Sequence, residues 1–264
     1  MRQFVADCEL DSDGCLCVRG KNFRYLGTVL RVQAGDAIYV RLLSGVLQPM
    51  TVAKIDSSEK TITLQISGSS VSLKKLEAVP EEKMRGPRLW LFMFVPKPAK
   101  MELIIRQAVE CGVSVIVPVE GEFCQSGFVQ SARNRCETND ERWSRIVTEA
   151  RQQSGSPVAT KIENTVSVEE ACRMWQSVNA DGRGSAVVLY ERTDGTKNIY
   201  SALENADSKK ERVAVAVGAE GGISPAEVKV LSDAGFIPVH LETNILRCET
   251  AAIYGIAAVQ TVMS

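Results

Sequence analysis

The stretch VAVAVGAEGGISPAE, residues 213–227, passes from an apolar run through a glycine-rich loop into the start of a helix. Its first five residues, 213–217, have the length and β-branched content of a strand buried on both faces, which is typical of a parallel sheet flanked by helices. Ser224, Pro225 and Glu227 supply an N-cap, a proline at the first helical position and the acid of a capping box. Strand, loop and helix are all predicted locally, and the fold class is α/β.

The loop between this strand and this helix is a candidate ligand site. Gly218, Gly221 and Gly222 would let backbone amides approach a bound molecule closely. Glu220 disfavours an anion, and the loop has neither a G-x-G-x-x-G nor a G-x-x-x-x-G-K-[ST] motif, so a neutral or cationic ligand is favoured. The alternative is that Glu220 only interacts with the positive end of the next helix and that the glycines only form a turn.

A second informative stretch, FIPVHLETNILRCETAA at 236–252, follows shortly afterwards. VGAEGGIS from residue 217, Glu227, GF at 235–236 and L-x-x-x-ILR-x-ETA from Leu241 together resemble the RsmE family, the 16S ribosomal RNA uridine-N3 methyltransferases of the SPOUT superfamily. Three upstream segments are similar to family segments as well: FRYLGTVLRVQAGD at 23–36, KMELIIRQAVECGVSVIVP at 100–118 and RWSRIVTEARQQSG at 142–155. The resemblance therefore extends over nearly the whole chain.

The chain also departs from the family pattern at several positions. Ala219 stands where the family has proline, and Ile223 stands where it has phenylalanine. Glu242 and Asn244 replace a typical glycine and arginine, and the segment EGEFCQSG at 120–127 lacks the usual arginine. How Glu242 and Asn244 affect activity does not follow from the sequence.

The resemblance implies a fold and an activity. The expected fold is a SPOUT-type trefoil-knotted parallel sheet preceded by a small PUA-like β-barrel, in a homodimer. The expected activity is S-adenosylmethionine-dependent methylation of N3 of a uridine in the 16S ribosomal RNA of the small subunit. The knot follows from the resemblance alone, because general base rates oppose threading a chain through itself.

Site residues can be predicted from the geometry of a parallel sheet. Strands expected at 186–190, 213–217 and 236–241 would end at one sheet edge, where open α/β sheets bind their ligands. The residues predicted there to contact the cofactor are Leu189, Tyr190, Glu191, Gly218, Ala219, Glu220, Gly221, Gly222, Leu241, Ile245, Leu246 and Thr250.

The expected methyl transfer requires positioning of the acceptor and removal of the proton on uridine N3. Arg247 is a candidate for stabilising the uracil anion or holding an RNA phosphate, and Glu249 is a candidate for accepting the proton or orienting Arg247. The alternative interpretation, equally well supported, is that these two residues form an ion pair at the start of the last helix. His240, at the end of a buried strand, is more typical of a core imidazole than of a general base.

The domain organisation is read from changes in pattern along the chain. Short β-rich segments at 37–43, 46–55, 60–67 and 71–79 predict a small barrel. A charged, proline-containing linker is expected at 80–87, and alternating strands and helices follow it. We therefore assign residues 1–75 to an RNA-binding domain and residues 76–264 to a methyltransferase domain.

Charge distribution indicates where RNA would bind. The net charge of the 264-residue chain is only −1, but residues 19–31 contain four basic side chains and no acid. These are Arg19, Lys21, Arg24 and Arg31, with Phe23 and Tyr25 beside them for base or sugar contact. A solvated surface cluster is the alternative.

Composition limits the other possibilities. The eight cysteines form no C-x-x-C pair and His240 is the only histidine, so no metal site is expected. No apolar stretch is long enough to cross a membrane and the N-terminus does not resemble a signal peptide, so a cytoplasmic protein is expected. The alanine- and glycine-rich last helix fits a dimer interface or a helix buried in its own domain.

Two other functions compete with the methyltransferase. A non-catalytic ribosome-assembly or RNA-binding protein with the same fold is the first, because of the departures after Leu241. A nucleotide-using oxidoreductase is the second, but the acidic loop and the missing fingerprint oppose it. The modified nucleotide, the general base, and the choice between intact subunit and free RNA do not follow from the sequence.

Overall fold

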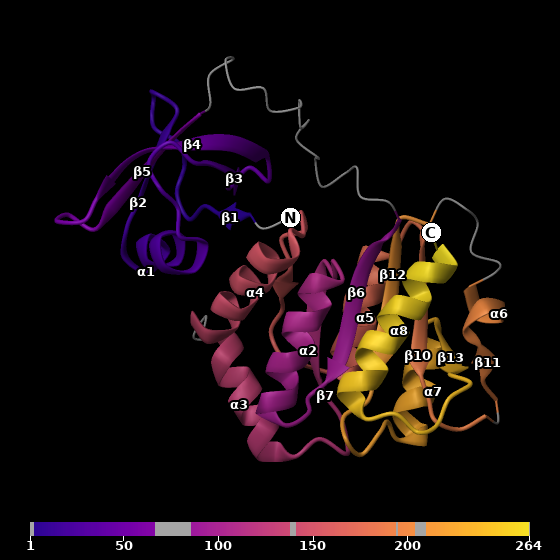
Figure 1. The fold of residues 1–264 in the computed structure, drawn as a ribbon. Helices are drawn as coiled ribbons and strands as arrows, with labels where there is room; N and C mark the ends of the chain where they lie inside the picture. Colours follow the sequence, from indigo (N-terminus) through magenta and orange to yellow (C-terminus); the bar gives the residue numbers. More distant parts are fainter. Residues whose placement is uncertain (1–2, 67–85, 138–140, 194, 204–209, 264) are drawn as a thin grey trace. The chain divides into compact units, whose positions relative to one another are not determined.

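A computed structural model describes residues 3–66, 86–137, 141–193, 195–203 and 210–263 (Figure 1). The chain divides into two compact units. The first contains residues 1–84 and 151–157, and the second contains residues 85–150 and 158–264. The predicted domain boundary at residue 75, the predicted strand at 71–79 and most of the predicted linker at 80–87 lie outside the described residues.

The second unit is built on a parallel sheet. Its strands are β6 (Arg88–Phe94), β7 (Val115–Glu120), β8 (Lys161–Ile162), β9 (Val166–Ser167), β10 (Gly184–Leu189), β11 (Lys197–Asn198), β12 (Arg212–Val217) and β13 (Phe236–His240). Their order is β11-β13-β10-β12-β6-β7-β8, with β9 also paired to β7, and each of these described pairs is parallel. The predicted α/β fold with a buried strand at 213–217 is confirmed.

Helices cover both faces of this sheet (Figure 1). One face carries α2 (Pro98–Glu110), α3 (Ser126–Glu137), α4 (Glu141–Ser154), α6 (Ile199–Leu203) and α8 (Cys248–Met263), and the other carries α5 (Val168–Val178) and α7 (Pro225–Asp233). Strand β6 shows the alternation: Leu91 and Met93 pack toward α2, whereas Phe92 and Phe94 pack toward α5. The sheet is therefore buried on both sides.

The capping box predicted at Ser224 is present, and a second one opens α5. Ser224 Oγ accepts from the Glu227 N–H at 3.3 Å, and Glu227 Oε2 accepts from the Ser224 N–H at 2.9 Å. Ser167 and Glu170 make the same pair of bonds at 3.2 and 2.9 Å. These bonds satisfy backbone donors that have no partner within the helix, so α7 and α5 begin where their sequences predict.

The first unit contains a five-stranded sheet. Its strands are β1 (Phe4–Val5), β2 (Cys15–Val18), β3 (Ala37–Arg41), β4 (Leu47–Asp56) and β5 (Thr61–Ile66), in the order β1-β3-β4-β5-β2. The β1–β3 pair is parallel and the other pairs are antiparallel. A short helix, α1 (Gly20–Arg24), continues into one π-helical turn, η1 (Tyr25–Leu30), and Leu26 fills the core of the sheet. The sequence had predicted β3, β4 and β5 but not the short strands β1 and β2.

Candidate functional site

Three loops at one edge of the parallel sheet surround a cavity of about 620 Å³. They follow β10, β12 and β13, which are neighbours in the order β13-β10-β12, so their carboxyl ends lie together. The predicted convergence of these three loops is confirmed. Every predicted cofactor residue except Thr250 lines the cavity; Thr250 is exposed on the first turn of α8.

The glycine-rich loop presents main chain to this cavity. Ala219 and Gly222 form an isolated bridge, with the Gly222 N–H donating to the Ala219 carbonyl at 3.0 Å. A β-carbon on Gly218 would fall 2.7 Å from the carbonyl carbon of Gly222, and Gly222 itself has φ of 78°. Side chains at these positions would break the turn, so the tight backbone wall depends on the glycines.

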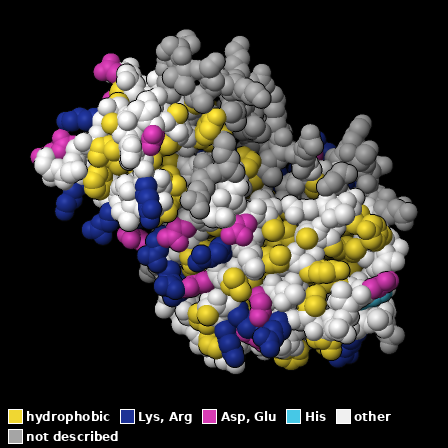
Figure 2. All heavy atoms as spheres, viewed as in Figure 1, with side chains coloured by type: hydrophobic (Ala, Val, Ile, Leu, Met, Phe, Trp, Pro, Cys, Tyr) yellow, Lys and Arg dark blue, Asp and Glu magenta, His cyan; other side chains and the backbone are white. Residues whose placement is uncertain are grey.

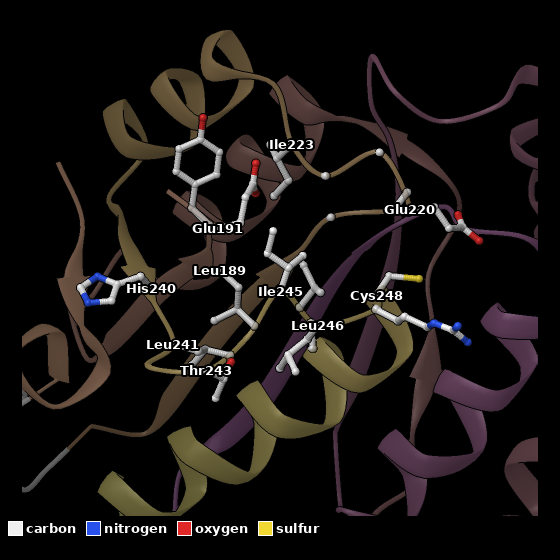
Figure 3. Close-up of a pocket in the computed structure, with 18 of the residues that line it drawn as sticks. Leu189, Glu191, Glu220, Ile223, His240, Leu241, Thr243, Ile245, Leu246 and Cys248 are labelled. Atoms are coloured by element: carbon white, nitrogen blue, oxygen red, sulfur yellow. The ribbon is translucent and has the colours of Figure 1, made fainter. Parts of the chain in front are cut away.

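An apolar surface forms the middle of the cavity. Figure 3 shows Leu189, Leu241, Ile245 and Leu246 gathered there, with Glu191 and Glu220 at its margins. Ile245 is 86 % exposed, which is unusual for so apolar a side chain. A flat apolar group such as an adenine ring would cover this surface and remove it from water.

A charged cluster lies at one end of the cavity. The Lys100 ammonium, on the first turns of α2, is 2.9 Å from Glu249 Oε2 and 3.5 Å from Glu220 Oε1. The Lys97 backbone N–H also donates to Glu220 Oε1 at 3.3 Å. The cluster thus links α2, the glycine-rich loop and α8.

Lys100 was not predicted as a site residue. It entered only as the first residue of the family-like segment 100–118, because a sequence does not state which strands are neighbours. The available signal was its position shortly after the apolar run that forms β6, whose carboxyl end lies at the same sheet edge. In the structure β6 pairs with β12, and this pairing brings Lys100 to the loop that follows β12.

Glu249 is held as an anion. Burial raises its pKa, but hydrogen bonds from Lys100, from its own backbone N–H and from Cys248 outweigh burial and lower the pKa to about 2. Its partner is Lys100, so the alternative of an Arg247–Glu249 ion pair is wrong. Among the described residues the Arg247 guanidinium has no ion-pair partner, and it lines the cavity directly before α8. A carboxylate with so low a pKa is a weak proton acceptor at neutral pH.

Cys248 and His240 have structural partners. Burial, followed by the hydrogen bond to Glu249, raises the pKa of the Cys248 thiol to about 12, so it remains protonated and donates to Glu249 at 3.3 Å. His240 Nδ1 lies 2.7 Å from Thr196 Oγ1, and in Figure 3 the imidazole lies at the side of the cavity opposite Glu220. This placement agrees with a satisfied, half-buried imidazole.

The four predicted RNA-binding residues all lie in the first unit, on or next to α1 and η1. Arg19 precedes α1, Lys21 and Arg24 are on α1, and Arg31 follows η1; all four are exposed. Phe23 and Tyr25 are only partly exposed and pack against the core of this unit, so they are less available for base contact than the sequence suggested.

In the part of the chain that the structure describes, no helix is long and apolar enough to cross a membrane.

Comparison with known proteins gives a consistent result. The model of the RNA methyltransferase domain family matches residues 83–260. Ribosomal RNA small subunit methyltransferase E of Bacillus subtilis is 24% identical over 245 residues, covering 92% of this chain and 88% of the relative. The protein of the same name from Rickettsia conorii is 28% identical over 242 residues, covering 89% and 85%.

Solved structures share the fold over nearly the full length. A ribosomal RNA small subunit methyltransferase E from Neisseria gonorrhoeae, bound to S-adenosyl methionine, matches with a TM-score of 0.78 at 22% identity and covers 99% of this chain and 98% of its own. A methyltransferase from Legionella pneumophila in complex with the same cofactor matches with a TM-score of 0.76 at 19% identity, covering 98% and 96%.

Proposed function

The chain belongs to the RNA methyltransferase domain family, and from this premise we propose that it transfers the methyl group of S-adenosylmethionine to N3 of a uridine in 16S ribosomal RNA. The observation that carries the proposal is the cavity at the carboxyl ends of β10, β12 and β13, with its glycine backbone wall and acidic margin. The near-full-length relatives named ribosomal RNA small subunit methyltransferase E support the choice of substrate.

The cavity residues fit S-adenosylmethionine. Backbone around Gly218 and Gly222 would contact the ligand closely, and Leu189, Leu241 and Leu246 would hold the adenine. Glu220 and Glu191 at the margins favour a cation over an anion. When bound, this cofactor supplies an electrophilic methyl group on a positively charged sulfur.

The chain's own residues would then position and activate the uridine. The proton on N3 must leave before or during the attack, and a nearby cation would stabilise the uracil anion. Arg247 is the best-placed group for this role because it lines the cavity and has no ion-pair partner among the described residues. We assign Glu249 to positioning rather than proton transfer, since its carboxylate is bound to Lys100.

The finer features of the fold form part of the same proposal. We propose that the loops after β10, β12 and β13 form a SPOUT-type trefoil knot and that the five-stranded sheet of the first unit is a PUA-like barrel that binds RNA through Arg19, Lys21, Arg24 and Arg31. The methyltransferase fold of the solved neighbours supports the first, and the exposed basic cluster around α1 supports the second. We retain 1–75 and 76–264 as the domain ranges and the cytoplasm as the location.

A homodimer is proposed from the surface of α8. One face of this helix is buried through Ala252, Ile256 and Val259, so the reading as a helix packed in its own domain holds for that face. The opposite face exposes Tyr254 at 48 %, and Figure 2 shows hydrophobic side chains gathered over α8. An exposed apolar patch of this kind is typical of a protein interface.

The function is tested by incubating the protein with methyl-labelled S-adenosylmethionine and small ribosomal subunits that lack the modification, followed by mapping of the label on the RNA. Label on uridine N3 is expected. Cofactor binding without methyl transfer to intact subunits or free RNA would favour the non-catalytic RNA-binding protein, for which Asn244 at the cavity in place of arginine is the supporting observation.

A further inference from the structure

Among the described residues, Lys100 is the only cation that lies between a carboxylate of the cavity lining, Glu220, and the carboxylate of Glu249 at the start of α8. Its ammonium contacts Glu249 at 2.9 Å and Glu220 at 3.5 Å, and the exposed fractions of the three side chains are 25, 17 and 33 %. Because water covers so little of these groups, their charges are screened less than those of a surface ion pair.

Two members of the cluster, Lys100 and Glu249, have shifted pKa values. The hydrogen bond to Glu249 raises the pKa of Lys100, so the ammonium remains protonated. The carboxylate of Glu249 remains ionised because its pKa is lowered to about 2. Glu191, Glu220, Lys100 and Arg247 line the cavity, and Glu249 contacts Lys100, so these five groups include one more carboxylate than cation.

The ligand changes its own charge during the proposed reaction. The S–CH₃ bond breaks, its electron pair remains on sulfur, and the methyl group forms a bond to uridine N3. The positively charged sulfonium becomes a neutral thioether, and the proton of N3 leaves to solvent. A cavity of net negative charge therefore binds the donor more tightly than the product, and the difference depends on how much negative charge is left uncompensated.

We propose that Lys100 is a specificity-determining residue of the cofactor site, because its ammonium offsets Glu220 and Glu249 and thereby sets how strongly the cavity prefers the sulfonium donor to the thioether product. This inference rests on the proposed function. Lys100 acts through the two carboxylates and so also holds the glycine-rich loop next to α8. Loss of that link would weaken the binding of both ligands equally. Loss of the positive charge would instead change the ratio of their two Kd values.

The test is calorimetric titration with S-adenosylmethionine and with S-adenosylhomocysteine, comparing the ratio of the two Kd values. Lys100→Met is expected to shift the ratio in favour of the sulfonium on the order of fivefold, and Lys100→Arg is expected to restore the wild-type ratio. Glu220→Gln is expected to shift the ratio in the opposite direction. Raising the salt concentration should reduce these shifts.

Lys229→Met is the matched control, because it removes a lysine from an exposed ion pair with Asp233 on α7. Its ratio should equal that of the wild type. An unchanged ratio in folded Lys100→Met overturns the proposal; if that variant does not fold, an unchanged ratio in Glu220→Gln overturns it. Failure of the wild type to bind either ligand would instead refute the proposed function.

Discussion

Gly221 lies directly against Phe123, so that a β-carbon on Gly221 would fall 2.7 Å from the β-carbon of Phe123. Phe123 belongs to the turn after β7, and this turn is tied to the start of α7 because the Glu122 N–H donates to Glu227 Oε1 at 2.7 Å. The sequence suggested that Gly221 either lets the backbone approach a ligand or forms a turn. The structure adds that it leaves space for the neighbouring turn.

Substitution of Gly221 should therefore destabilise the protein as well as weaken cofactor binding. Gly221→Val should show both effects, because its side chain would meet Phe123 before it meets a ligand. Gly221→Ala should cost about 1–3 kcal/mol of unfolding free energy, measured by urea denaturation. Gly127→Ala on α3, where a β-carbon meets nothing within 4 Å, is the control and should not destabilise. Equal stabilities of the two variants would contradict this account.

Arg247→Met should lower kcat by about 10²-fold without weakening the binding of S-adenosylmethionine, since the guanidinium is assigned to the uracil anion rather than to the cofactor. Arg247→Lys should recover part of the rate. Single-turnover methyl transfer and calorimetry measure the two quantities separately. A normal kcat in Arg247→Met would remove Arg247 from the mechanism.

Glu249 should contribute to stability in a pH-dependent way. Its pKa is about 2 in the folded protein against an ordinary value of 4.5, so its contribution is present above pH 4.5 and is lost as the pH falls toward 2. The difference in unfolding free energy between wild type and Glu249→Gln should therefore shrink below pH 4.5. Glu149→Gln, which removes an exposed pair with Arg145 on α4, should show little pH dependence. A difference that grows as the pH falls would refute the assigned direction.

Arg24→Glu should weaken RNA retention and leave cofactor affinity unchanged, because Arg24 is exposed on α1 in the first unit while the cavity lies in the second. The log of affinity should also depend less steeply on log salt, since one phosphate contact is lost. Lys54→Glu, which changes the charge equally in the same unit, is the control. Equal losses in both variants would indicate non-specific attraction.

Tyr254→Asp should convert the proposed dimer to a monomer, because a charge would be buried at the apolar face of α8. Sedimentation velocity measures the change. Leu103→Asp on α2, which is 41 % exposed, should leave the assembly unchanged. A wild type that sediments as a monomer would refute the proposed dimer.

Local chemistry made much of the second unit predictable. Ser224, Pro225 and Glu227 predicted the start of α7, and Ser167 with Glu170 forms the same motif at the start of α5, since a capping box involves only neighbouring residues. The β-branched run at 213–217 predicted β12 because it too is a pattern of neighbouring residues. Strands β1 and β2 were missed because runs as short as Phe4–Val5 have no periodicity and are stabilised by distant strands.

The cavity was only partly predictable from the sequence. That loops after three strands would converge followed from the chain alone, because parallel strands end at the same sheet edge. The pairing of Lys100 with Glu249, and the contact of Phe123 with Gly221, required the order of the strands and the packing of α2 beside α8. Backbone preferences act between residues that are neighbours in the sequence, so the sequence alone predicts them. Charge pairing acts through space between residues that only the folded chain brings together.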